Sequence, residues 1–131
     1  MIHDRLLSQF YGIHAMTGYE WPMIAFIRKY VSKHIPEAKV RMDRLGNLYI
    51  TKGEAGVGYP TLTCHMDQVQ TVHSEDFEVC QEGDILYGWS EQNQQREGLG
   101  ADDKNGIYIA IRCLEECPQL KVFMAVGEET T

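Results

Sequence analysis

Hydrophobic side chains recur every three or four residues in three segments of the chain, a spacing typical of helices that pack on one side. These segments are residues 4–14, 20–34 and 103–117. Pro36 and Pro118 follow the second and third segments, and proline ends a helix because it lacks a backbone N–H. Before the second segment, Thr17 and Glu20 form a capping-box pattern, which predicts that each side chain bonds a free backbone N–H of the helix start.

Short β-prone runs lie between and after these helices. The predicted strands are residues 40–43, 48–51, 60–64, 77–80, 85–87 and 120–126. A turn at Gly46 joins residues 40–43 and 48–51 into a predicted hairpin, and a turn at Gly83 joins residues 77–80 and 85–87 into another. The polar residues 89–98 predict a mobile loop. We expect residues 60–64 to be an internal strand, and the apolar run 120–126 to be covered on both faces. Alternation of strands and helices predicts an α/β fold.

Length and composition are typical of one globular domain: 131 residues, 44% hydrophobic and 24% charged. A net charge of -7 without a Lys/Arg run argues against a nucleic-acid-binding protein. No stretch approaches the ~18 apolar residues that a membrane span needs, and the N-terminus has no apolar leader. The four cysteines form no C-x-x-C pair, which favours reduced thiols in a cytoplasmic protein.

Candidate chemistry lies in three clusters, each at the end of a predicted strand or the start of a predicted helix. Ligands collect at such positions in open α/β sheets. The first cluster is His65 with Asp67, in which a neutral imidazole can bind zinc while a carboxylate orients it through the other ring nitrogen. By itself this pattern is more often a surface pair without function.

The second cluster is Asp102 with Asp103. One aspartate at a helix start is ordinarily an N-cap, but a carboxylate there can also bridge two divalent ions about 3.5–4 Å apart. The third cluster is Glu128 with Glu129, directly after the last predicted strand. One glutamate can bind a metal while the other acts as general base on a water. The alternative is a solvated acidic turn.

Taken together, the clusters resemble the N-terminal part of the catalytic domain of the aminoacylase, carboxypeptidase G and peptidase T family of two-zinc exopeptidases. Residues 64–67 and 100–106 are most similar to the tripeptidase (peptidase T) branch, and residues 17–20 and 44–47 match as well. The resemblance implies a three-layer α/β/α catalytic domain with a mixed sheet. It also implies that residues 1–131 are the N-terminal portion of that domain.

Each matching residue acquires a role from the resemblance. His65 binds the first zinc, and Asp67 orients it. Asp102 bridges two zinc ions, and Glu129 binds the second, with cobalt or manganese as alternative metals. Glu128 is the general base that takes a proton from a metal-activated water. The implied substrates are short peptides or N-acyl amides, and the implied activity is that of an aminopeptidase or tripeptidase.

The family pattern includes two further metal ligands and a lid and dimerisation domain, which we expect to be missing from these 131 residues. Each zinc would then lose a protein ligand, and we expect weak or empty sites, since stable zinc sites usually have three or four protein ligands. Asp103 is expected to support the site or to cap the helix that starts there. An uncovered sheet edge or apolar face predicts a homo-oligomer. The alternatives are an inactive remnant that only associates, or, with less support, a redox protein using Cys113 and Cys117.

Overall fold

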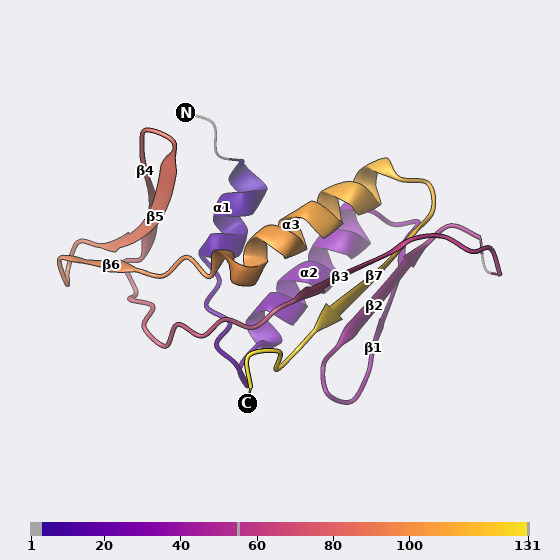
Figure 1. Ribbon diagram of the computed structural model, residues 1–131, viewed down its shortest axis with the longest axis horizontal. Helices are drawn as coiled ribbons and strands as arrows, with labels where there is room; N and C mark the ends of the chain where they lie inside the picture. Colours follow the sequence, from indigo (N-terminus) through magenta and orange to yellow (C-terminus); the bar gives the residue numbers. More distant parts are fainter. Residues whose placement is uncertain (1–3, 55, 131) are drawn as a thin grey trace.

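The computed structural model describes residues 4–54 and 56–130. Their elements, in chain order, are α1 (Arg5–Tyr11), α2 (Trp21–His34), β1 (Lys39–Met42), β2 (Leu48–Lys52), β3 (Thr61–His65), β4 (Glu78–Glu82), β5 (Ile85–Ser90), β6 (Gln95–Glu97), α3 (Ala101–Glu116) and β7 (Leu120–Ala125). Figure 1 shows the three helices together on one side of a sheet made by β1, β2, β7 and β3, with the remaining strands at the far end beyond α1.

The larger sheet is mixed, which confirms the α/β fold with a mixed sheet. Its strand order is β1-β2-β7-β3, with β1 and β7 antiparallel to β2, and β3 parallel to β7. The predicted hairpin of β1 and β2 is confirmed. The prediction that residues 60–64 form an internal strand is wrong within the described residues, because β3 lies at an edge. A short β-prone run predicts that a strand forms, but not which neighbours the strand pairs with.

The hydrophobic core fills the space between the helices and one face of this sheet. Ile50, Val122 and Leu62 lie side by side in register on that face. On the other face, Phe123 is half-buried and Lys121 is exposed. The expectation that residues 120–126 are covered on both faces is therefore wrong for the described part of the chain, which contains two of the three layers that the resemblance implies.

The start of α2 differs from the predicted capping box. Glu20 is the N-cap residue but makes no side-chain cap bond, and Pro22 lies in the first turn. The Thr17 hydroxyl instead donates to Asp67 Oδ2 at 2.8 Å, and Glu20 Oε2 accepts from the backbone N–H of Gly127 at 2.7 Å. Both side chains make long-range bonds in place of the local ones. The pattern therefore lies next to the helix start, but the N-cap is Glu20 and not Thr17.

A second sheet consists of β4, β5 and β6, all antiparallel, and confirms the hairpin around Gly83. The prediction of a mobile loop over residues 89–98 is wrong, because β5 continues to Ser90 and β6 pairs with it. The Ser90 hydroxyl is buried and donates to Asp76 Oδ1 at 2.8 Å, and Asp76 also accepts from the backbone N–H of Gln92. Polar side chains order this segment, so its hydrophobic pattern did not reveal it.

Two further expectations concern the helices and the cysteines. Among the described residues, the structure contains no helix long and apolar enough to cross a membrane. The four cysteines are free thiols. Cys113 and Cys117, near the end of α3, pack against the hydrophobic core, as the sequence favoured over a metal or redox role.

Candidate active site

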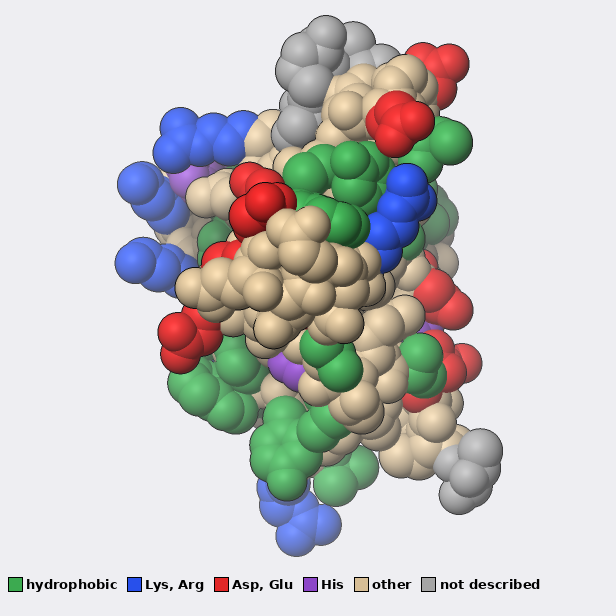
Figure 2. All heavy atoms as spheres, turned by 90° about the vertical axis from the view of Figure 1, so that its left-hand side faces the viewer, with side chains coloured by type: hydrophobic (Ala, Val, Ile, Leu, Met, Phe, Trp, Pro, Cys, Tyr) green, Lys and Arg blue, Asp and Glu red, His purple; other side chains and the backbone are tan. Residues whose placement is uncertain are grey.

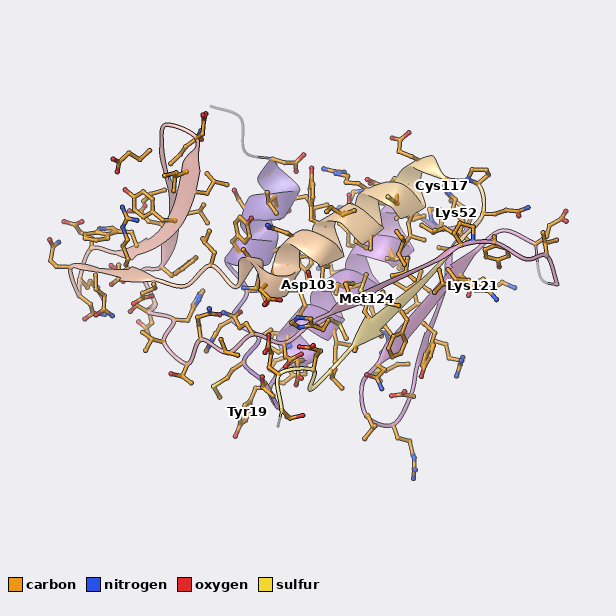
Figure 3. The ribbon with its side chains drawn as sticks, in the orientation of Figure 1. Tyr19, Lys52, Asp103, Cys117, Lys121 and Met124 are labelled. Atoms are coloured by element: carbon orange, nitrogen blue, oxygen red, sulfur yellow. The ribbon has the colours of Figure 1, made fainter. Side chains whose placement is uncertain are left out.

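The three predicted clusters meet at one end of the mixed sheet. His65 is the last residue of β3, and Glu128 and Glu129 follow β7. Because β3 and β7 are parallel neighbours, their carboxyl ends lie at the same edge, where α3 also begins. In Figure 3, Asp103 marks this start of α3, whereas Lys52 and Lys121 lie toward the opposite end of the strands.

The imidazole of His65 faces three carboxylates. Its Nε2 lies 2.9 Å from Asp102 Oδ1, 3.6 Å from Glu128 Oε2 and 3.8 Å from Glu129 Oε1. Its Nδ1 lies 2.9 Å from the backbone carbonyl oxygen of Asp67. When Nδ1–H donates to that carbonyl, Nε2 presents its lone pair to the acidic cluster, which is the arrangement of a metal-binding histidine.

Without a metal, a proton on His65 can supply the positive charge that offsets the neighbouring carboxylates. Burial lowers the pKa of His65, but the hydrogen bond to Asp102 and the charges of neighbouring carboxylates outweigh burial, so the pKa is raised. Burial and the negative charge of Glu128 raise the pKa of Glu129. Both shifts show that the cluster favours an added positive charge.

Asp67 is 1% exposed and makes more contacts than the one with His65 that the sequence predicted. Its Oδ1 lies 3.3 Å from His65 Nδ1, so the predicted contact exists, although the Asp67 carbonyl oxygen is the closer partner. Its carboxylate also accepts from the backbone N–H groups of Glu128 and Glu129, each at 3.0 Å. Burial would raise the pKa of Asp67, but these hydrogen bonds and that of Thr17 outweigh it and the pKa is lowered. Asp67 therefore links the histidine to the two glutamates as a carboxylate.

The donor atoms fit a divalent cation. Ligand atoms of His65, Glu128 and Glu129 all lie within 4.8 Å of one another, and Asp102 Oδ1 adjoins the same imidazole nitrogen. Nitrogen from imidazole with carboxylate oxygens is a donor set that zinc accepts. Glu129 is the more enclosed glutamate, with 24% of its side chain exposed, whereas the side chain of Asp102 is 82% exposed and lies at the rim.

Asp103 has the supporting position that the sequence suggested. Its Oδ2 accepts from the backbone N–H of His65 at 3.2 Å, which joins the start of α3 to the end of β3. Its carboxylate occupies the space that a side chain at Gly106 would need, since a Cβ there would lie 2.3 Å from Asp103 Oδ1. No site role was predicted for Asn47 or Lys104 from the sequence.

Lys104 is buried beside this site. It is 2% exposed, and its ammonium donates to the backbone carbonyls of Tyr11 and Ile13. Burial lowers its pKa to about 7. It ties α3 to the end of α1, and its place in the Asp-Asp-Lys segment was the signal that could have drawn attention to it.

A large cleft lies away from the acidic cluster. A cavity of about 650 Å³ between α1 and α2 is lined by residues that include Arg5, Lys29, Lys33 and Tyr30. Figure 2 shows the end of the molecule that carries α1 and the second sheet, with Lys and Arg side chains along one edge of the surface. We assign the candidate site by chemistry, because potential metal-ligand atoms converge in the acidic cluster.

Searches by sequence give no match, since no protein-family model and no curated protein matches the chain. Solved structures do. A tripeptidase from Staphylococcus aureus subsp. aureus Mu50 superposes with a TM-score of 0.71 and 24% identity, covering 95% of this chain and 35% of that chain. Aminopeptidase PepT from Bacillus cereus ATCC 10987 gives 0.70 and 25%, covering 95% and 36%.

Aminoacylhistidine dipeptidase from Vibrio alginolyticus is also similar, with a TM-score of 0.71 and 19% identity, covering 96% of this chain and 27% of that chain. The chain thus spans about a third of the length of the first two peptidases and less of the third. The comparison confirms the resemblance predicted from the sequence: over nearly its whole length, this chain has the fold of a part of peptidase T-type exopeptidases.

Proposed function

We propose that the chain carries part of the catalytic centre of a zinc-dependent exopeptidase that hydrolyses short peptides. The observation that carries this proposal is the convergence of His65 Nε2 with carboxylates from two other segments, the start of α3 and the turn after β7. The similarity to a tripeptidase, an aminopeptidase and a dipeptidase supports the peptidase class. The free cysteines agree with a cytoplasmic protein.

His65, Asp102 and Glu129 are the residues that we propose to hold zinc. Asp102 is the residue that we propose to be shared between two zinc ions, because its side chain lies at the rim of the site and next to the imidazole nitrogen of His65. When bound, zinc polarises a scissile carbonyl and lowers the pKa of a water. Asp67 keeps the imidazole oriented through its carbonyl and stays ionised, since its pKa is lowered.

Glu128 is the proposed general base. Its side chain is 55% exposed and its Oε2 lies 3.6 Å from His65 Nε2, so it borders the proposed metal position and remains open to water and substrate. There it takes a proton from the attacking water and passes it to the leaving amine. Its backbone N–H donates to the buried carboxylate of Asp67, which fixes the position of the backbone that carries the Glu128 side chain.

Self-association is part of the proposal. β1 and β3 are the edges of the mixed sheet, and Tyr49 and Phe123 are only half-buried on the face away from the helices. Unpaired edges and partly apolar faces favour pairing with another chain. A protein that light scattering shows to be strictly monomeric at micromolar concentration would contradict this part. An inactive association module is the alternative function, and the same surface favours it.

A calorimetric zinc titration of the metal-stripped protein tests the metal site, with Glu129→Ala as the variant. Glu116→Ala is the matched control, since it removes the same charge from an exposed position at the end of α3. We expect zinc binding that weakens in Glu129→Ala and not in the control. Equal binding by all three proteins would sink the assignment. Hydrolysis of tripeptides with and without zinc or cobalt then separates a peptidase from an association module.

A further inference from the structure

The turn after β7 is held by side chains from three distant segments. Four consecutive backbone N–H groups, those of residues 126–129, each donate to one of these side chains. Asn47 Oδ1 accepts from residue 126 at 2.8 Å, and Glu20 Oε2 accepts from residue 127 at 2.7 Å. The two carboxylate oxygens of Asp67 accept from residues 128 and 129. This set of acceptors lies directly beneath the two glutamates of the candidate site.

The three acceptors replace regular secondary structure. β7 ends at Ala125, so strand pairing no longer fixes the backbone that carries Glu128 and Glu129. Backbone N–H groups that leave water need other partners. Here the partners come from the N-cap of α2, the turn between β1 and β2, and the residues after β3. Three parts of the fold thus meet on one turn.

Both ends of the Asn47 side-chain amide are hydrogen-bonded, which fixes its orientation. Its Nδ2 donates to Asp43 Oδ2 at 2.9 Å, which leaves Oδ1 directed at the turn. Gly46 beside it has a φ of +102°, and a Cβ there would lie 3.1 Å from Ile24 and 3.5 Å from Val126. The glycine therefore lets the β1–β2 turn approach both α2 and the residue that Asn47 binds.

Glu20 is a buried carboxylate whose side chain reaches the acidic turn. It is 6% exposed and makes no cap bond to its own helix. No ion pair among residues 4–54 and 56–130 includes it. Its side chain accepts from the backbone N–H of Gly127, whose φ of +67° is the left-handed conformation that starts the acidic turn. A buried carboxylate is costly without a partner, so this contact indicates a specific use.

We propose that Glu20 and Asn47 are positioning residues, which hold residues 126 and 127 so that Glu128 and Glu129 face His65. They act through the backbone of the turn, since each accepts a hydrogen bond from one of its N–H groups. The consequence for zinc binding rests on the function proposed above. The positioning itself is a property of the protein without metal and is tested separately.

The first measurement is amide hydrogen exchange of metal-free protein. Glu20→Ala and Asn47→Ala should speed exchange at residues 126–129 by about ten-fold or more, since losing a hydrogen bond to a charged or buried acceptor exposes its donor. Exchange in the β2 and α3 core should stay unchanged. Glu20→Gln keeps an acceptor oxygen and should restore slow exchange, and Glu116→Ala again serves as the charge-matched control.

The second measurement is zinc affinity of the same proteins. Loss of an outer-shell partner typically weakens metal affinity about 10- to 100-fold, and we expect this range for Glu20→Ala, with recovery in Glu20→Gln. Unchanged exchange at residues 126–129 in both alanine variants would overturn the proposal, as would an unchanged zinc affinity where the parent protein binds zinc. If the parent binds none, the proposed function fails, and the exchange data still decide the positioning. If Glu20→Ala does not fold, Asn47→Ala and Glu20→Gln carry the test.

Discussion

Replacing Asp67 with asparagine tests the central structural claim about the site. The carboxylate accepts three hydrogen bonds, from the hydroxyl of Thr17 and from the backbone N–H groups of Glu128 and Glu129. Asparagine has the same shape but only one acceptor oxygen. If that oxygen takes the Oδ2 position, it keeps the bonds to Thr17 and Glu129, and its NH₂ group then faces the N–H of Glu128. Asp67→Asn therefore changes bonding without creating a cavity.

The expected loss follows from the bonds that cannot form. A hydrogen bond to a charged acceptor contributes about 1.5–3 kcal/mol, and a buried donor without a partner costs about 1–3 kcal/mol. These figures overlap for the same N–H, so we expect Asp67→Asn to lower the free energy of unfolding by about 2–4 kcal/mol. That is a large part of the roughly 5–15 kcal/mol of a typical domain.

Urea denaturation followed by circular dichroism measures this difference, with Asp84→Asn in the exposed β4–β5 turn as the control for charge. The pKa of Asp67 is lowered from the ordinary value of 3.8, so the unfolded chain binds this proton first. Its contribution is present above 3.8 and is lost as the pH falls through the folded-state pKa. If Asp67→Asn lowers the free energy of unfolding of the parent protein by less than about 0.5 kcal/mol, which is the usual range of surface substitutions, the reasoning is refuted.

Three further results are expected. Because burial lowers the pKa of Lys104 to about 7 from 10.5, the unfolded chain binds more protons between these two values, and stability should rise as the pH increases from about 7 to about 10.5; Lys104→Met should abolish this rise, and parallel urea midpoints of the two proteins would contradict it. Burial raises the pKa of Cys64 to about 12, so mass spectrometry should find it unmodified by iodoacetamide until urea unfolds the protein, and rapid alkylation of the native state would count against this. Gly46→Ala should destabilise by more than Gly56→Ala, because both have positive φ but only Gly46 has neighbours within 4 Å; equal thermal midpoints would show that the close approach to Ile24 is unimportant.

The sequence predicted the helices, both hairpins and the α/β class, because those depend on local periodicity and on turn residues. It failed where polar side chains decide the structure. Residues 89–98 have no hydrophobic pattern, yet Asp76 and Ser90 order them into a turn and a strand. The position of β3 at the sheet edge was also missed, because pairing depends on contacts between segments far apart in the chain.

For the candidate site, the sequence brought His65, Asp102 and Glu129 together only through their places at strand and helix ends and through resemblance. The structure places their side chains around one imidazole nitrogen. Asp67 was predicted to orient His65, and its bonds to the turn after β7 were not foreseen. Glu20 was misjudged because its local pattern with Thr17 is a good capping box, and no local rule reveals that its carboxylate bonds Gly127 instead.

The bonds around the acidic turn bear on how a part of a peptidase fold can keep a formed site. His65 is fixed by β3 and by the carbonyl of Asp67, and residues 126–129 are fixed by Asn47, Glu20 and Asp67. All these contacts lie within the described residues, so this part of the fold itself sets the positions of the proposed ligands. We therefore expect substitutions at these partner residues to weaken zinc affinity as well as to loosen the turn.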